Sequence, residues 1–277
     1  MLRLIVFFKK KGGFQVRRLL KAIFAGTAIL FLAACGSNEA SSGSDGMNLI
    51  KDGEFSFASS GEFKPFSVTD AKGSMTGFDI EVGEAVAKEL GLKPIQKKMK
   101  FGSIVESVKA GRVDAAIASH TITEERLEQV SFSTPYYYSG PQIYVRPDSS
   151  VKTLDDLEGL EIAVAKGTTY EEDAKKVTES IIFYDSDVTA IEALSRGKHD
   201  AVITDFITGK EAIGAGMKIV GKELIGKSEQ AIAVGKDNKE LLKKINAALE
   251  TLRENGTLTE ISKKYIGEDI TVDPEKE

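Results

Sequence analysis

Short apolar runs alternate with helical periods along most of this chain. Strand-like runs occur at residues 161–165 and 200–204, and helical patterns of apolar positions occur at residues 170–177, 188–194 and 238–265. Strands that alternate with helices in this way are typical of parallel pairing, because a parallel connection needs a crossover helix. The pattern therefore predicts an α/β protein whose sheets are mostly parallel.

One segment of the pattern occurs twice. Residues 103–119 and 189–205 align without gaps, share five identical residues in seventeen, and each predicts a helix, a turn and a strand. Gly111 and Gly197 stand where a left-handed residue would end the helix. Such a unit also recurs by chance in α/β proteins. However, each copy ends in polar residues, and open α/β sheets bind ligands beyond the carboxyl ends of their strands. Two lobes that face each other across a cleft are expected.

The N-terminal segment has the features of an export signal. Residues 1–34 contain seven basic residues and no acidic one, and residues 22–32 are almost all apolar. About eleven apolar residues are too few to cross a membrane but suit a signal peptide. The run ends in Leu-Ala-Ala-Cys, a pattern that predicts cleavage before Cys35 and lipidation of its thiol. The alternative is a buried structural cysteine, which the polar residues after Cys35 disfavour.

Charge and cysteine content narrow the class of protein further. Without residues 1–34, 30 basic and 42 acidic residues remain, so the net charge is 30 − 42 = −12. This charge argues against a nucleic-acid partner. Cys35 is the only cysteine, so the exported part can form no disulfide. Residues 35–48 are rich in Ser, Gly and Asn and predict a flexible tether to a folded part, which is long enough for one large domain or two lobes.

Three positions suggest how a small ligand would be held in the cleft. The guanidinium of Arg126 matches a carboxylate, and Thr168 and Thr169 follow Gly167 where a strand turns into a helix. Asp205 would supply the opposite charge. A ligand with carboxylate and ammonium on one carbon would join the lobes through these groups. Taken singly, Arg126 could be a surface cation, Thr169 a helix N-cap and Asp205 a loop cap.

Seven short motifs in order give the chain a family resemblance. They are Lys64-Pro65-Phe66, Gly77-Phe78-Asp79-Ile80, Gly111-Arg112-Val113-Asp114, Thr121-Ile122-Thr123-Glu124-Glu125-Arg126, Phe132-Ser133-Thr134-Pro135-Tyr136, Leu154-Asp155-Asp156-Leu157 and Gly167-Thr168-Thr169. Each motif alone is weak. In this order and spacing, over residues 55–266, the chain resembles the family 3 solute-binding proteins of amino-acid ABC importers.

The resemblance implies a set of ligand-binding residues. Arg126 and Thr169 would clamp the α-carboxylate of an amino acid, with Thr168 beside them, and Asp205 would take its ammonium. Ser119 and Thr121 would hydrogen-bond the same head group. The remaining implied residues, which would flank the ligand's side chain, are Phe63 and Phe101.

The resemblance also implies a fold with defined limits. We expect a two-lobed periplasmic-binding-protein-like fold of type II, with two crossing hinge segments at residues 139–146 and 230–235. Lobe 1 would comprise residues 49–142 and 231–268, lobe 2 residues 143–230, and an acidic tail residues 269–277.

The predicted function is binding without catalysis or cofactor. An amino acid, expected to be polar, would be captured by hinge closure and presented to a membrane permease and its ATPase. The protein would be a monomer, lipid-anchored on the extracellular face of the cell membrane. Two alternatives stay open: a ligand-sensing domain for a membrane partner, and an exported lyase or dehydratase on the same scaffold. The sequence offers no metal-ligand spacing.

Some residues narrow the choice of substrate. The family often has an acid about four residues before the Pro-Phe pair and a serine at position 118, where this chain has Ser59-Ser60-Gly61 and Ala118. A basic ligand side chain then lacks a partner unless Glu62 points inward. His120 is expected to be a packed core residue rather than a cleft residue.

Residues 221–228 match the P-loop pattern, but a strand-like run comes after them instead of a helix, so the match is read as a coincidence.

Overall fold

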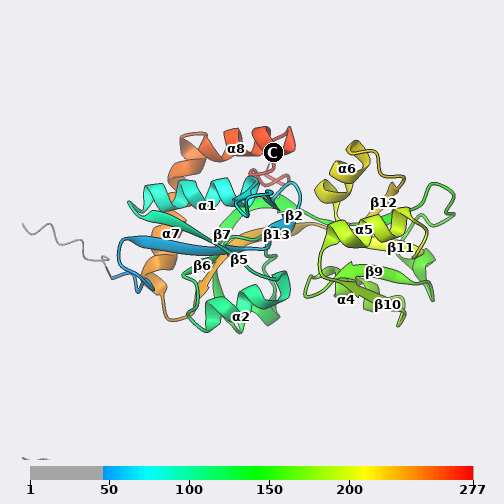
Figure 1. Ribbon diagram of the computed structural model, residues 1–277, viewed down its shortest axis with the longest axis horizontal. Helices are drawn as coiled ribbons and strands as arrows, with labels where there is room; N and C mark the ends of the chain where they lie inside the picture. The colour runs from blue at the N-terminus through cyan, green and yellow to red at the C-terminus, as the bar shows by residue number, and fades with distance from the viewer. Residues whose placement is uncertain (1–45, 277) are drawn as a thin grey trace, which may run out of the picture. The chain divides into compact units, whose positions relative to one another are not determined.

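Two five-stranded sheets carry the fold, one in each lobe (Figure 1). The computed structural model describes residues 46–276. The first sheet has the order β5-β1-β6-β13-β7 and the second β10-β9-β11-β8-β12. The first sheet comprises β1 (Glu54–Ser59), β5 (Lys93–Lys98), β6 (Ala115–Ala116), β7 (Val130–Ser139) and β13 (Ser228–Gly235). The second comprises β8 (Pro141–Val145), β9 (Ile162–Ala165), β10 (Ile181–Tyr184), β11 (Ala201–Asp205) and β12 (Val220–Leu224).

Both sheets are mixed rather than mostly parallel. In the first sheet β1 pairs in parallel with β5 and β6, while β13 pairs antiparallel with β6 and β7. In the second, β9 pairs in parallel with β10 and β11, while β8 pairs antiparallel with β11 and β12. In each sheet the strand that runs against the others, β13 in the first and β8 in the second, is the strand that directly follows a crossing from the other lobe. The predicted α/β fold with two lobes is confirmed, and the connecting strands explain the mixed pairing.

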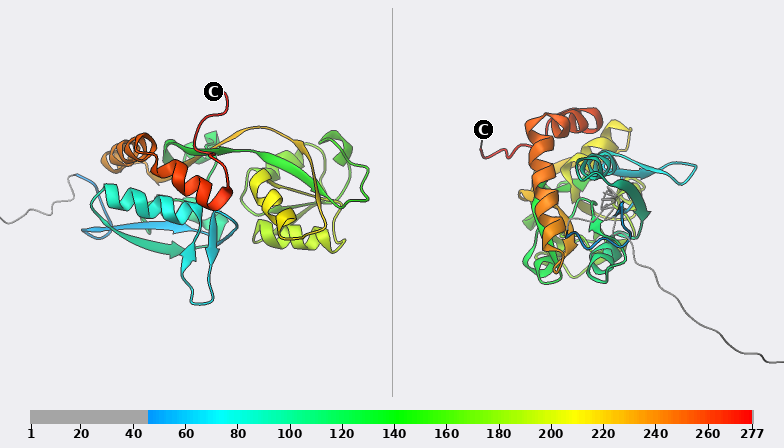
Figure 2. Two further views of the ribbon diagram at one scale, coloured as in Figure 1. Left: turned by 90° about the horizontal axis from the view of Figure 1, so that it is seen from above. Right: turned by 90° about the vertical axis from the view of Figure 1, so that its left-hand side faces the viewer.

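The chain passes between the lobes at two places that contact each other. One lies at Gly140, between β7 and β8, and the other at residues 225–227, between β12 and β13 (Figure 2, left). A Cβ on Gly140 would meet the carbonyl oxygen of Gly226 at 2.0 Å, so this crossing requires glycine. The second crossing segment was predicted at residues 230–235. That prediction is wrong, because these residues lie inside β13 and pair with β6 and β7.

Helices cover both faces of the first sheet. Ala115 and Ile117 pack with α1, α7 and α8, while Ala116 and Ala118 point to the opposite face, toward α2. Successive strand residues alternate between faces, which explains this division. The lobe's remaining elements are β2 (Glu62–Phe63), β3 (Ser67–Thr69), β4 (Met75–Thr76), α1 (Phe78–Glu89), η1 (Phe101–Ser103), α2 (Ile104–Lys109), α3 (Glu124–Leu127), α7 (Lys239–Glu254) and α8 (Thr257–Ile266).

The second lobe repeats this arrangement on a smaller scale. Ile162 and Val164 face one apolar cluster, which includes Ala174 of α4, whereas Ala163 faces a cluster with Ile191 of α5. Its helices are η2 (Asp155–Leu157), α4 (Tyr170–Lys175), α5 (Asp187–Ser195) and α6 (Phe206–Gly214). Each lobe therefore has its own buried core, and the chain between them is limited to the two crossings.

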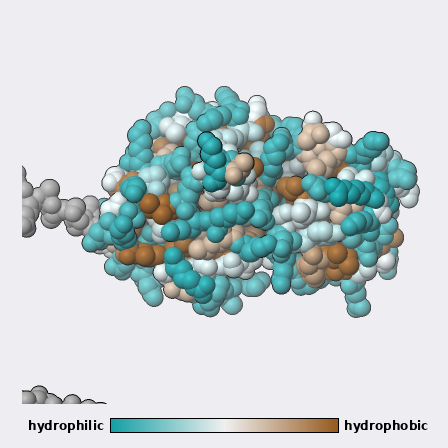
Figure 3. All heavy atoms as spheres, in the orientation of Figure 1, coloured by the Kyte–Doolittle hydropathy of each residue, from teal (hydrophilic) through white to brown (hydrophobic). Residues whose placement is uncertain are grey.

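The predicted signal peptide and lipidated Cys35 lie outside the described residues, as does most of the predicted tether. Within residues 46–276, no helix combines the length and apolar character needed to cross a membrane. The face seen in Figure 3 is mostly hydrophilic, with scattered hydrophobic spots. The helical pattern at residues 238–265 forms two helices, α7 and α8, separated by Asn255 and a left-handed Gly256.

Candidate ligand-binding site

A cavity lies between the lobes and contains side chains of both. It encloses about 450 Å³, part of it open to solvent. Seven of the eight predicted ligand-binding residues line it. Five belong to the first lobe and two to the second: Phe63, Phe101, Ser119, Thr121 and Arg126, then Thr168 and Thr169. The other lining residues, which sequence reasoning did not assign to binding, are Ser60, Glu62, Ala165, Tyr170, Asp185, Ser186 and Asp187.

Arg126 is held in the cavity wall by backbone oxygens of both lobes. The Thr123 hydroxyl accepts a bond from the backbone N–H of Arg126 at 3.2 Å, which fixes the start of α3. The guanidinium donates to the carbonyl of Thr121 at 2.8 Å and to that of Gly167, in the other lobe, at 3.0 Å. It also lies 5.9 Å from the ring centroid of Phe101. With the lobes close together, these contacts hold the guanidinium in the cavity wall.

The charge of Arg126 lacks an anionic partner within residues 46–276. The side chain is 9% exposed, and burial lowers the pKa of its guanidinium from the ordinary value. The group stays cationic, since arginine keeps its proton in proteins. Its bonding partners in the described part of the chain are carbonyls rather than carboxylates. A buried cation without a counter-charge strongly favours an anion, so this wall of the cavity is suited to a carboxylate.

The two threonines stand where the lobes come closest. Gly167 has φ +80°, and a Cβ there would meet the Cα of Gly102 in the first lobe at 2.9 Å. The Thr168 hydroxyl donates to the carbonyl of Ala165 at 2.7 Å, while Thr169 makes no side-chain capping bond to α4. The helix predicted at residues 170–177 ends at Lys175 and has six residues. Both threonines line the cavity directly before this short helix.

Ser119 is held in a strained conformation by buried partners. Its φ of 58° is the one positive value among the described residues other than glycine. The Ser119 hydroxyl donates to the Asp79 carboxylate at 2.8 Å, and the Ser119 N–H donates to the Tyr136 hydroxyl at 3.0 Å. Tyr136 in turn donates to Asp79 at 2.6 Å. Because the hydroxyl proton of Ser119 is directed to Asp79, its oxygen offers lone pairs to the cavity and can accept from an ammonium.

Asp205, the eighth predicted residue, does not line the cavity. It is 1% exposed, and its carboxylate accepts from the Ser139 hydroxyl at 2.5 Å and from the Ile207 N–H at 2.9 Å, so that it caps α6. Asp187 of the same lobe lines the cavity instead and accepts from the Thr204 hydroxyl at 2.7 Å. Burial raises the pKa of Asp187 to about 6 and that of Asp205 to about 7.

The sequence does contain a signal for Asp187 as a candidate cavity residue, because it is the first residue of a helix that comes after a strand. Ser186 caps this helix, and the sequence there, Tyr-Asp-Ser-Asp, places two acids at the carboxyl end of β10. Which acid faces the cavity depends on how the second lobe packs against the first. That packing is not readable from local sequence.

Aromatic side chains form the apolar walls. Phe63 stacks on Phe66 with ring centroids 4.9 Å apart, and Phe101 stacks on His120 at 4.5 Å. His120 is 1% exposed, and its Nδ1 has no hydrogen-bond partner among residues 46–276. Burial holds the pKa of His120 well below its usual range, so the ring is neutral. The prediction of a packed rather than cleft-facing histidine agrees with this position.

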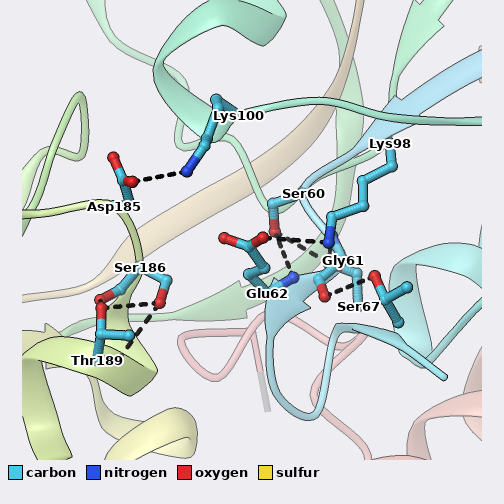
Figure 4. A network of polar contacts seen from close by, with 10 residues as sticks. Ser60, Gly61, Glu62, Ser67, Lys98, Lys100, Asp185, Ser186 and Thr189 are labelled. Atoms are coloured by element: carbon cyan, nitrogen blue, oxygen red, sulfur yellow. Dashed lines mark hydrogen bonds and ion pairs between the residues drawn. The ribbon is translucent and has the colours of Figure 1, made fainter. Parts of the chain in front are cut away.

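Charged residues gather at the Glu62 end of the cavity (Figure 4). Glu62 pairs with Lys98 at 3.1 Å, and Asp185 pairs with Lys100 at 2.6 Å across the two lobes. Glu62 thus lines the cavity, which the sequence left open. Within residues 46–276, no group of three or more His, Cys, Asp or Glu side chains could hold a metal ion.

The chain matches known proteins over most of its length. Residues 55–268 match the bacterial extracellular solute-binding proteins, family 3. The L-cystine-binding protein TcyJ of Escherichia coli K12 is 32% identical over 233 residues, which cover 81% of this chain and 87% of that protein.

Solved structures of other proteins resemble this chain both in fold and in sequence. An ancestral arginine-binding protein bound to arginine has a TM-score of 0.74 at 36% identity, covering 78% of this chain and 99% of that one. The arginine-, lysine-, histidine-binding protein ArtJ of Geobacillus stearothermophilus has a TM-score of 0.76 at 31% identity, covering 81% and 100%. All three names describe binding proteins. The chain belongs to the family 3 extracellular solute-binding proteins.

Proposed function

We propose that this protein captures an amino acid between its lobes and presents it to the permease of an ABC importer. The observation that carries the proposal is the buried Arg126 guanidinium, which faces a cavity shared by both lobes and has no carboxylate partner within residues 46–276. The family and the amino-acid ligands in its relatives' names support it. A free α-carboxylate supplies the missing charge.

In the proposed binding mode, each charged group of the amino acid contacts a protein side chain of opposite charge. The α-carboxylate binds Arg126 and the Thr169 hydroxyl, while the ammonium donates to Ser119 and to Asp187. Of the two buried acids, Asp187 is favoured because it lines the cavity. Asp205, which the resemblance implies, keeps its bonds to Ser139 and Ile207. Phe63 and Phe101 border the ligand's side chain.

Ligand contacts on both lobes also supply the proposed transport signal. A ligand shifts an equilibrium between open and closed forms only as far as it binds one form better. Arg126 of the first lobe and Thr169 of the second can hold one carboxylate together only when the lobes are close. The closed form then carries the ligand, and the permease distinguishes it from the open form by the relative position of the lobes.

The test is calorimetric titration of the purified protein with amino acids, followed by the variant Arg126→Ala. The variant should lose roughly 2–5 kcal/mol of binding free energy, or about thirty-fold to several thousand-fold in affinity, because it leaves a desolvated carboxylate unpaired. Arg253→Ala is a matched control, since Arg253 also bonds a carbonyl but lies outside the cavity lining. A loss below threefold for Arg126→Ala would contradict the assignment.

We further propose that the protein is a monomer anchored by lipid on Cys35 at the extracellular face. The signal-like residues 1–34 and the motif before Cys35 support the anchor. Cells grown with a labelled fatty acid should incorporate the label into this protein. The substitution Cys35→Ala should abolish the labelling and release the protein from the membrane fraction; label retained on the variant would contradict the anchor. Size-exclusion chromatography with light scattering tests the monomer.

A further inference from the structure

Four charged side chains at one end of the cavity alternate in sign. Glu62 of β2 pairs with Lys98, and Asp185, in the loop after β10, pairs with Lys100 (Figure 4). The two acids line the cavity, whereas neither lysine is part of that lining. Lys100 and Asp185 belong to different lobes, so this group of four, the charged quartet, is assembled only when the lobes are close.

The ion pairs of the charged quartet are open to exchange with a ligand. Lys98 and Glu62 are 42% and 37% exposed, and Lys100 and Asp185 are 63% and 71% exposed. Exposed ion pairs contribute about 0–1 kcal/mol each, because water screens the charges and both side chains lose freedom. An incoming charged group that makes the same contacts can therefore rearrange these pairs at small cost.

We infer that the charged quartet is a binding site for a second head group, and that the ligand is an amino acid whose far end carries both an ammonium and a carboxylate. The inference rests on the proposed function, since Arg126 and Asp187 must hold the first head group. At the far end the ammonium would bind Glu62 and Asp185, and the carboxylate would bind Lys98 and Lys100. The ligand class is therefore the diamino dicarboxylic acids.

The charge balance of the site distinguishes this class from basic amino acids. After Arg126 and Asp187 are matched to the first head group, the two acids and two lysines of the charged quartet sum to zero. A guanidinium or ammonium alone would gain from the acids but would lie close to the two lysine charges. A zwitterionic end meets opposite charges on both sides. Ser60 and Ser186, which also line this end, add hydroxyl groups for its hydrogen bonds.

The first experiment compares dissociation constants of the protein for four probes by calorimetry. The probes are L-cystine, meso-2,6-diaminopimelate, L-arginine and L-glutamine. The two diamino dicarboxylic acids should bind at least tenfold more tightly than arginine or glutamine. Arginine or glutamine binding as tightly as both would overturn the inference. Binding of no amino acid at all would instead contradict the proposed function, as would an unchanged affinity in Arg126→Ala.

Paired substitutions then test the two signs of the charged quartet. Glu62→Gln with Asp185→Asn should weaken the diamino dicarboxylic acids about tenfold and leave glutamine unchanged, because charged hydrogen bonds to the second ammonium are lost. Lys98→Gln with Lys100→Gln should weaken them similarly and strengthen arginine, because the acids then stand unpaired. Glu268→Gln, which removes an exposed ion pair with Lys210 outside the cavity lining, is the matched control. Equal effects of both pairs on all four probes would overturn the inference.

Discussion

The two copies of the repeated helix, turn and strand have the same local structure but end in different surroundings. In the first copy, α2 leads through Gly111 into β6, and in the second, α5 leads through Gly197 into β11. Gly111 and Gly197 have φ of 65° and 80°, as the predicted left-handed helix stops require. The equivalent Asp114 and Asp200 each accept a backbone N–H from a neighbouring segment: Asp114 from Ser56 in β1, and Asp200 from Glu161, which directly precedes β9.

The ends of the two strands diverge. Ser119, after β6, lines the cavity, whereas Asp205, at the end of β11, turns inward and caps α6. A serine hydroxyl donates to a buried aspartate at both ends, from Ser119 to Asp79 and from Ser139 to Asp205. In the first pair the serine lines the cavity, whereas in the second pair neither Ser139 nor Asp205 does. The repeated sequence therefore determines the local helix, turn and strand. The packing of each copy against the facing lobe determines which residue at the strand end lines the cavity.

The largest expected effect concerns the buried carboxyls on which this comparison depends. Burial raises the pKa values of Asp79 and Asp187 to about 6 and that of Asp205 to about 7. A folded pKa above the unfolded value means that the folded state binds more protons between about pH 4 and 7, so stability falls as pH rises through that window. From pH 7.5 to pH 5 the ligand-free protein should gain roughly 3–5 kcal/mol in unfolding free energy. Urea titrations at the two pH values measure this, and a loss of stability toward pH 5 would contradict it.

The next effect separates Asp187 from Asp205. Asp187→Asn should weaken amino-acid binding about tenfold to a hundredfold, because a charged hydrogen bond to the ammonium is lost. Binding of a ligand without the amino group should hardly change. Asp205→Asn should leave the amino-acid affinity within about threefold, since Asp205 does not line the cavity. Calorimetry measures the affinities of both variants. A larger loss for Asp205→Asn than for Asp187→Asn would instead assign the ammonium contact to Asp205. Binding to the unmodified protein should also weaken below pH 6, as Asp187 takes up a proton.

The smallest effect tests whether the two copies are equivalent in their local bonds. Asp114 accepts from the backbone of Ile50 and Ser56 and from the Ser56 hydroxyl. Within the described part of the chain, Asp200 accepts from one N–H, that of Glu161. Asp114→Asn should therefore cost roughly 2–3 kcal/mol of unfolding free energy and Asp200→Asn about 1 kcal/mol. Equal losses in urea unfolding would show that the additional bonds of Asp114 contribute nothing.

Much of the site was predictable because its residues are tied to motifs that local structure preserves. Thr123 caps α3 and so fixes the backbone position from which the Arg126 side chain extends. Gly167 adopts the left-handed conformation of the turn that places Thr168 and Thr169. Phe63 and Phe101 also line the cavity as expected. The charged residues from the second lobe were not found, since Asp185 and Asp187 acquire their place only when β10 and α5 face the first lobe.

The crossing segments show the same limit. An apolar run at residues 231–234 predicts a buried strand correctly, but it does not show to which sheet the strand belongs. Strand partners are distant in sequence, and the crossing at Gly226 is set by its contact with Gly140, 86 positions away.

The sequence by itself determined the α/β class, the repeated unit with its two left-handed glycines, the family and most of the lobe 1 residues that line the cavity. These features depend on residue periods, on backbone freedom and on short motifs whose contacts are local. The tertiary structure alone decided the mixed sheets, the place of the second crossing, and which of Asp187 and Asp205 lines the cavity. It also assembled the charged quartet. Each of these depends on which distant surfaces pack together, and packing is a property of the whole chain.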